Sequence, residues 1–118
     1  MKREQPIELA IIQKANDLIL WFVPVLTKLP REYKFALGER MMTSLFDLLD
    51  ELVIARFSRE KLDLLNAINI RLERLRYQTK MLLEFKLIDG QRYSHASKLI
   101  NAVGVDLGGW IKQQQRKK

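Results

Sequence analysis

Few side chains in this sequence could act as catalytic groups, and their spacing does not favour catalysis. The single histidine, His95, has Tyr93, Ser94 and Ser97 as near neighbours, and none of these is a second metal ligand or a carboxylate. Ser94 and His95 do not form a hydrolase pair, because adjacent side chains on a helix diverge and no nucleophile elbow surrounds them. We therefore expect His95 to have a structural or solvent-exposed role.

Three carboxylates in the first half of the chain are a second candidate site. Asp47, Asp50 and Glu51 lie within one turn or so of each other if this segment is helical, and in principle they could bind a metal. A di-metal carboxylate bundle also needs Glu-x-x-His pairs on two helices, and the sequence contains none. Ion pairs and solvation explain such clusters more often. With no cysteine and no glycine-rich phosphate loop either, the sequence predicts no enzyme, no metal site and no cofactor.

Basic side chains give a stronger indication of function. One group lies on a predicted helix and the other at the C-terminal end: Arg71, Arg74, Arg76 and Lys80, then Lys112, Arg116 and Lys117. At about 100° per residue, Arg71 lies on one flank of the leucine stripe of its helix, and Arg76 and Lys80 share the other flank. Together these residues could contact several phosphates, with an affinity that depends strongly on salt. For any one of them, pairing with Glu73, Glu84 or the acidic preceding helix is the alternative.

The net charge of +7 is unevenly distributed along the chain. Residues 1–57 hold eight basic and eight acidic side chains, whereas residues 58–118 hold thirteen basic and six acidic ones. A segregated positive half favours a polyanionic partner, with nucleic acid ahead of an anionic membrane. Solubility alone is the alternative explanation.

Three glycines, Gly104, Gly108 and Gly109, precede Trp110 within what otherwise resembles one amphipathic helix. Each glycine costs roughly 1 kcal/mol relative to alanine in a helix interior. Glycines at i and i+4 lie on one face and permit the close approach of another backbone. We expect this segment to form either a helix interface between subunits or a space for a bulky neighbour within the core.

The segments that position these residues repeat apolar side chains every three or four residues, and none alternates with period two. The expected helices cover residues 6–28, 31–57, 59–87 and 93–114, with a basic tail at 112–118. Pro24 is expected to kink the first helix, Ser58 to cap the third, and Gly90 to adopt a left-handed conformation in a turn. Short connections predict one all-α domain, an antiparallel up-down four-helix bundle.

Membrane segments are not expected from the sequence. No apolar run reaches the ~18 residues of a membrane span, and the first helix lacks the charge order of a secretory signal. Without cysteines, the chain is expected to be soluble and cytoplasmic, with no membrane partner.

Three motifs, in this order, carry a resemblance to a known family. They are Pro24-x5-Pro30-Arg31, Leu75-Arg76-x3-Lys80, and Val103-Gly104-x3-Gly108-x-Trp110-Ile111 followed by the basic tail. In their order, and over nearly the whole chain, they resemble the accessory variability determinant (Avd) proteins of diversity-generating retroelements. Those proteins belong to a wider group of four-helix bundles that includes proteins encoded in intervening sequences of 23S ribosomal RNA genes.

The resemblance implies a non-catalytic bundle that assembles as a homopentameric barrel. It further implies binding of the retroelement's reverse transcriptase and of template RNA or cDNA, in support of mutagenic retrohoming. Arg76 and Lys80 match the family's basic pair, whereas Arg71 and Arg74 are added from charge placement in a stretch that is more mixed in charge than a cationic strip. The alternatives are an intervening-sequence-type bundle, or a helical protein-interaction adaptor, without a polymerase partner.

Overall fold

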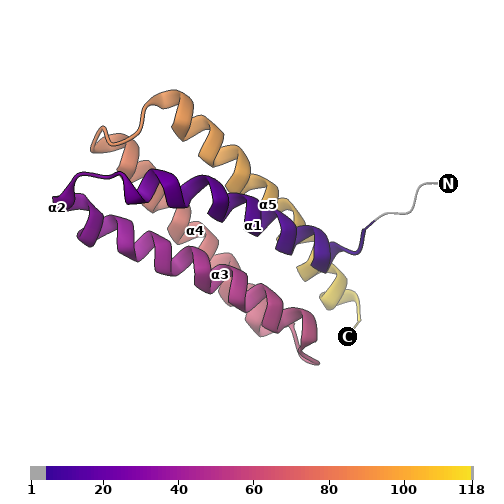
Figure 1. Cartoon of the computed structure of the whole chain (residues 1–118). Coiled ribbons are helices and arrows are strands. Elements are labelled where there is room, and N and C mark those ends of the chain that lie inside the picture. The colour runs from indigo at the N-terminus through magenta and orange to yellow at the C-terminus, as the bar shows by residue number, and fades with distance from the viewer. Residues whose placement is uncertain (1–4, 118) are drawn as a thin grey trace.

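Residues 5–117 are described by the computed structural model, and within them the chain forms helices and no strand. The elements are α1 (Ile7–Thr27), α2 (Arg31–Tyr33), the π-helical turn η1 (Lys34–Gly38), α3 (Glu39–Phe57), α4 (Leu62–Glu84) and α5 (Gly90–Arg116). Because α2, η1 and α3 follow one another without a break, the molecule has four long helical segments that alternate in direction (Figure 1). The predicted all-α class with four helices is confirmed.

Each helix of the bundle packs against two neighbours. Helix α1 lies against α3 and α5, and α4 lies against the same two helices from the opposite corner (Figure 1). The apolar stripes meet along the bundle axis, where Phe22, Leu48, Leu75 and Trp110 are all at most 1% exposed. Burial of each such side chain contributes roughly 1.5–3 kcal/mol, so these stripes hold the four helices together.

The connection between α1 and α3 contains two features that position the start of α3. Helix α1 continues through Pro24 to Thr27, and the extended backbone of Pro30 ends the link before α2 begins. Gly38 in η1 is buried, and a Cβ at this position would lie 3.4 Å from Leu29 Cδ1 and 3.5 Å from the Leu26 carbonyl oxygen. An added Cβ would therefore make ordinary van der Waals contacts there, which shows how close the start of α3 lies to the end of α1.

The prediction that Ser58 begins the third helix was wrong. The backbone of Ser58 is extended and ends α3, and its hydroxyl donates to the Ile54 carbonyl oxygen at 2.7 Å. Helix α4 begins only at Leu62. The amine of Lys61 donates to the carbonyl oxygens of Ala55 at 2.7 Å and Arg56 at 3.0 Å. The free carbonyls at the end of α3 attract these donors, so both side chains cap α3 instead of α4.

The prediction of a left-handed Gly90 was also wrong, because the left-handed residue of this loop is Lys86, with φ 62°. Its amide donates to Leu83 at 2.9 Å and the next amide, that of Leu87, donates to Leu82 at 2.8 Å. This is the Schellman pattern that closes a helix C-terminus. Gly90 is instead the first residue of α5, which therefore begins earlier than the expected residue 93.

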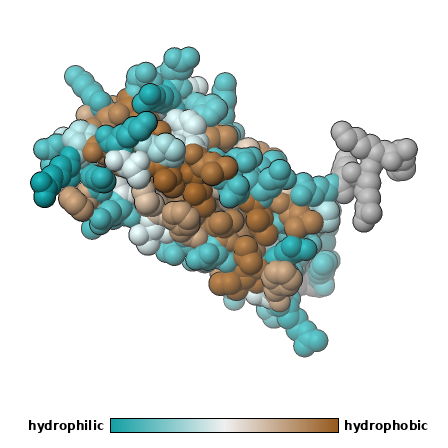
Figure 2. Space-filling view, in the orientation of Figure 1, coloured by the Kyte–Doolittle hydropathy of each residue, from teal (hydrophilic) through white to brown (hydrophobic). Residues whose placement is uncertain are grey.

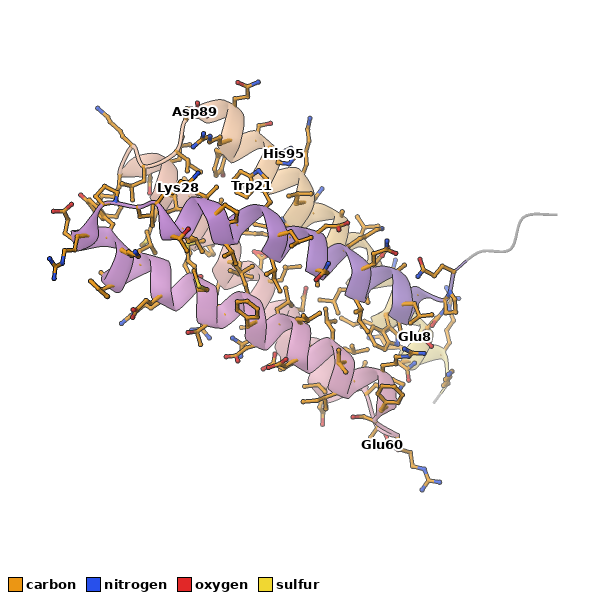
Figure 3. All side chains as sticks on the ribbon, viewed as in Figure 1. Glu8, Trp21, Lys28, Glu60, Asp89 and His95 are labelled. Carbon is orange, nitrogen blue, oxygen red and sulfur yellow. The ribbon has the colours of Figure 1, made fainter. Side chains whose placement is uncertain are left out.

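An aspartate explains this earlier start of α5. The Asp89 carboxylate accepts a hydrogen bond from the Arg92 amide at 2.8 Å, so Asp89 is the N-cap of the helix (Figure 3). An N-cap carboxylate satisfies one of the free amides of the first turn. The cap therefore fixes the first turn of α5 and the level at which the helix begins.

Helix α1 is more apolar than the sequence expectation allowed. Among the described residues it is the one helix long and apolar enough to cross a membrane by length and composition, with a mean hydropathy of 1.5 over an 18-residue window. A single helix of this kind is weak evidence for a membrane, since core helices have the same composition. Only 33% of that window is buried within this chain, so α1 also contributes apolar groups to the outer surface.

Candidate nucleic-acid interface

The predicted cations of α4 lie on two sides of that helix. Arg71 faces α3, whereas Arg76 faces α5, which agrees with the flanks expected from helical spacing. Lys80 is one turn after Arg76 and is exposed, and Arg74 is exposed beside the groove between α3 and α4. The four cations therefore do not form one continuous surface on α4.

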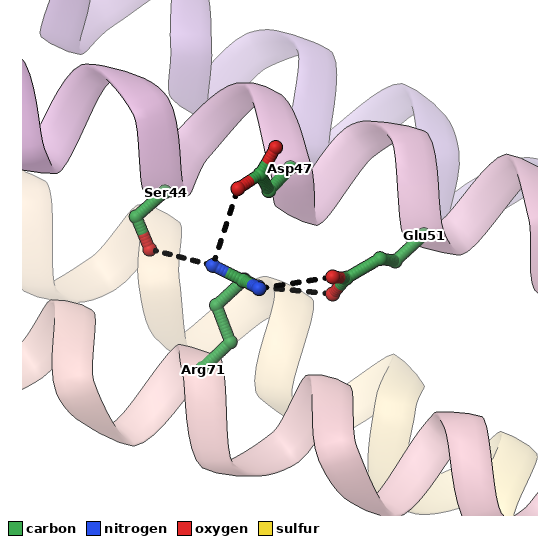
Figure 4. A network of polar contacts seen from close by, with 4 residues as sticks. All are labelled: Ser44, Asp47, Glu51 and Arg71. Carbon is green, nitrogen blue, oxygen red and sulfur yellow. Dashed lines mark hydrogen bonds and ion pairs between the residues drawn. The ribbon is translucent and has the colours of Figure 1, made fainter.

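Arg71 is held by an ion-pair network that links α4 to α3 (Figure 4). Its Nε and Nη2 each donate to a different oxygen of the Glu51 carboxylate, both at 2.9 Å. Its Nη1 lies 3.7 Å from Asp47 Oδ2 and donates to Ser44 Oγ at 3.4 Å. A phosphate would have to compete with a bidentate carboxylate for this guanidinium. The pairing with the acidic preceding helix, which the sequence left open, is therefore the interaction that Arg71 makes in this chain.

Arg76 lies across the contact between α4 and α5. Its Nη1 donates to Asn101 Oδ1 at 3.4 Å, and its Nε is 3.0 Å from Glu73 Oε2 without the alignment of a hydrogen bond. The side chain is 35% exposed and that of Glu73 57% exposed, so solvent screens this pair. Arg76 thus keeps part of its guanidinium at the surface, beside α5.

The contact between Arg76 and Asn101 shows which residues of α4 and α5 lie at the same height along the bundle axis. Helices α4 and α5 run in opposite directions, so one turn further along α4 corresponds to one turn back along α5. Lys80 therefore lies level with Lys98, and both side chains are exposed. Among residues 5–117 neither lysine has an ion-pair partner, so both charges are available to an anion.

Further cations continue along the outer side of α5. Lys98, Lys112 and Arg116 are separated by fourteen and four residues, which places them on one side of a helix with ~3.6 residues per turn. All three are exposed, as is Lys117 just after the helix. We call Arg76, Lys80, Lys98, Lys112 and Arg116 the basic face.

The three glycines of α5 have different surroundings. A Cβ on Gly104 would lie 2.8 Å from Arg76 Nη2 and 3.4 Å from Leu72 Cδ2, so the glycine makes room for α4 side chains. A Cβ on Gly109 would lie 3.1 Å from Ile7 Cδ1 of α1. Gly108 has no described atom of other elements within 4 Å of that position. Of the two expected roles, packing inside the bundle therefore applies to Gly104 and Gly109, while Gly108 faces open space.

Trp110 and the other candidate groups serve the bundle itself. The Trp110 side chain is 1% exposed and belongs to the core. His95 lies beside Trp21 of α1, with ring centroids 5.6 Å apart (Figure 3). Asp47 and Glu51 are engaged by Arg71. Within residues 5–117 no group of three or more histidine or acidic side chains is arranged to hold a metal ion.

Comparison with known proteins identifies the family of this chain. A family model described as bAvd-like matches residues 9–114. The chain belongs to the bAvd-like family. No curated protein matches the sequence. The resemblance to accessory variability determinant proteins is thus confirmed, and the bAvd-like family is generally one of accessory, non-catalytic proteins.

In this bAvd-like protein, sequence reasoning missed two charged residues that matter for the surface. Lys98 was overlooked because it is isolated in the sequence, although its spacing of fourteen residues from Lys112 was a signal. Asp106 was not assigned any role, yet its Oδ2 lies 2.9 Å from Lys14 Nζ and joins α5 to α1. This pairing leaves the acidic group of α5 on the α1 side, away from the basic face.

Proposed function

We propose that this bAvd-like chain is a non-catalytic, cytoplasmic accessory subunit of a diversity-generating retroelement. It binds the retroelement's reverse transcriptase together with template RNA or cDNA, and so supports mutagenic retrohoming. Family membership supports the accessory role. The single observation that carries the nucleic-acid part is the basic face, in which Arg76 is partly exposed and the other four cations of α4 and α5 are exposed.

The chemistry of the basic face favours phosphate contacts without base readout. Arg76 and Lys80 lie one turn apart on α4, as Lys112 and Arg116 do on α5, so their donors can contact phosphates along a strand. Among residues 5–117, Glu73 is the carboxylate that forms an ion pair with a member of this face, and its side chain is more than half exposed. Binding by such a surface releases counterions and weakens steeply as salt rises.

Assembly would strengthen a modest affinity for each single copy. We propose a homopentameric barrel, in which several basic faces bind one long RNA or one RNA–polymerase complex. Linking binding sites in this way raises the apparent affinity by roughly 10²–10⁴ without any new contact. The polymerase chemistry belongs to the reverse transcriptase, and the accessory protein contributes scaffold and charge.

Charge reversal on the basic face tests the proposal. In the variant Lys80→Glu/Lys98→Glu both changes are at exposed side chains, so the bundle keeps its fold. The affinity for a fluorescently labelled single-stranded RNA is expected to fall at least ~10-fold at physiological salt, and the slope of log affinity against log salt by about one per lost contact. Arg76→Glu/Lys80→Glu tests the family's basic pair in the same assay.

A matched control separates local contacts from net charge. Lys28→Glu/Lys34→Glu changes the charge by the same amount at exposed positions at the end of α1 and in η1. This variant is expected to bind RNA within about twofold of the parent, since neither lysine belongs to the basic face. If both double variants lose affinity equally, or neither does, the basic face is not the binding site.

Pull-down of the reverse transcriptase with the same variants tests the protein partner. Capture of the polymerase without salt-sensitive RNA binding would favour the alternative of an adaptor that binds only protein.

A further inference from the structure

An apolar groove runs along the outer side of the bundle between α1 and α3. Its apolar lining is Leu9 and Ile12 of α1 with Leu49, Val53 and Ile54 of α3, and polar side chains, Gln13, Asn16 and Asp50 among them, complete it. Figure 2 shows hydrophobic surface gathered over these two helices. Val53 is 39% and Ile54 57% exposed. These exposed apolar side chains would lose contact with water if a partner covered the groove.

A second apolar surface lies on the outer side of α4. Ile70, Tyr77 and Met81 are 64%, 70% and 47% exposed. Their separations of seven and four residues place them in one stripe along the helix. Helix α4 is at the corner of the bundle opposite α1, so the α4 stripe and the groove point to different sides of the molecule (Figure 1).

The groove and the α4 stripe are complementary in shape and in charge. One is a shallow, open groove between two helices and the other is a row of side chains on a single helix, and such rows pack into grooves in helical interfaces. The exposed carboxylate of Asp50 lies among the groove residues, and the exposed guanidinium of Arg74 lies between Ile70 and Tyr77 in the stripe. Within residues 5–117 neither charge has an ion-pair partner.

We propose that the α4 stripe of one copy docks in the α1–α3 groove of a second copy of this chain, with Arg74 facing Asp50. Each copy then has one donor surface and one acceptor surface, so the contact is head-to-tail and repeats from subunit to subunit. The inference names the contact that holds together the assembly of the proposed function and rests on that proposal. It also assigns Arg74 to the subunit contact instead of to RNA.

The alternative of two grooves facing each other fits the charges less well. A two-fold contact brings the same surface of both copies together. It would place Asp50 near its own equivalent, where like charges repel, and would leave the α4 stripe exposed. The head-to-tail contact covers both apolar surfaces at once.

Charge exchange between the two surfaces tests the contact. The mass of the full chain is measured by light scattering on a sizing column for Asp50→Arg, Arg74→Asp and the double exchange. Each single variant is expected to raise the dissociation constant of the assembly at least ~10-fold, because two like charges then meet across a desolvated contact. The double exchange restores the pair with opposite polarity, and is expected to recover the mass of the parent.

Control variants establish that the effect is local. Asp17→Arg and Arg92→Asp make the same charge changes at exposed positions outside the groove and the α4 stripe, and are expected to assemble like the parent. Circular dichroism confirms that each variant keeps its helices. A monomeric parent, single variants that assemble normally, or folded single variants that the double exchange does not rescue would each overturn the contact.

RNA binding distinguishes this inference from the proposed function. The double exchange keeps the net charge and the basic face unchanged, so its RNA affinity is expected to equal that of the parent. If assembly responds as described but RNA binding is absent, the proposed function fails and the contact stands. If RNA binding depends on the basic face but assembly ignores Asp50 and Arg74, the contact fails and the proposed function stands.

Discussion

Glu51 and Arg71 form a bidentate ion pair between α3 and α4, with both nitrogen–oxygen distances at 2.9 Å. The two side chains are 26% and 21% exposed, so the pair is only partly screened by solvent. The pair fixes both the distance and the orientation of the two side chains, because a guanidinium fork matches a carboxylate in a single plane. Its role is to join the two helices.

Glu51→Gln is expected to lower the free energy of unfolding by about 1 kcal/mol, since it removes a partly exposed bidentate pair. Urea denaturation measures this. Asp50→Asn is the control, because Asp50 is exposed and has no ion-pair partner among the described residues. Its effect on the free energy of unfolding of the dissociated chain is expected to be close to zero. RNA affinity is expected to be unchanged in Glu51→Gln. A gain in RNA affinity would mean that the freed Arg71 contacts phosphate.

Gly108→Ala separates packing within a subunit from packing between subunits. The new Cβ meets no described atom of another element within 4 Å, so alanine should stabilise the single chain by about 0.5–1 kcal/mol through helix propensity. Thermal unfolding at low concentration measures this gain. If the same variant assembles more weakly than the parent, Gly108 lies in a subunit contact. Equal assembly would remove Gly108 from the interface.

Asp89→Ala is expected to destabilise the protein by about 1 kcal/mol, because the carboxylate caps the first turn of α5. Ser58→Ala serves as its comparison. The Ser58 hydroxyl donates to a carbonyl and caps no helix N-terminus, so its loss should cost less. Denaturation curves of the two variants check the order, and a larger loss in Ser58→Ala would contradict the assignment of the caps.

Trp110→Ala is expected to lower stability by about 3–5 kcal/mol, because it leaves a cavity at a core position that is 1% exposed. Val105→Ala, at a position 69% exposed on the same helix, should change the stability of the single chain by at most ~0.5 kcal/mol. Calorimetry or urea denaturation measures both. Similar effects in the two variants would contradict a core role for Trp110.

Much of the fold follows from the periodicity of apolar residues. Helices expected at 6–28 and 31–57 correspond closely to Ile7–Thr27 and to the continuous segment from Arg31 to Phe57. The opposite flanks of Arg71 and Arg76 also follow from helical spacing alone. These features depend on residues close in sequence, and the geometry of one helix relates such residues to each other whatever the helix packs against.

The ends of the helices could not be predicted from the residue type at each position. Ser58 and Gly90 have residue types typical of an N-cap and a turn, yet one ends α3 and the other begins α5. Donors and acceptors supplied by Lys61 and Asp89 decide these boundaries. Several residue types can satisfy a free backbone group, so the type at one position does not determine which helix end it serves.

The sequence by itself determined the all-helical class, the core stripes, the excess of positive charge in the second half and the family. Only the tertiary structure decided which charges remain available: Arg71 is paired with Glu51, whereas Lys80 of α4 and Lys98 of α5 are exposed. It also decided that a groove on α1 and α3 and a stripe on α4 are left uncovered. The reason is that pairing and exposure depend on the register between helices, which residues far apart in sequence set through their packing.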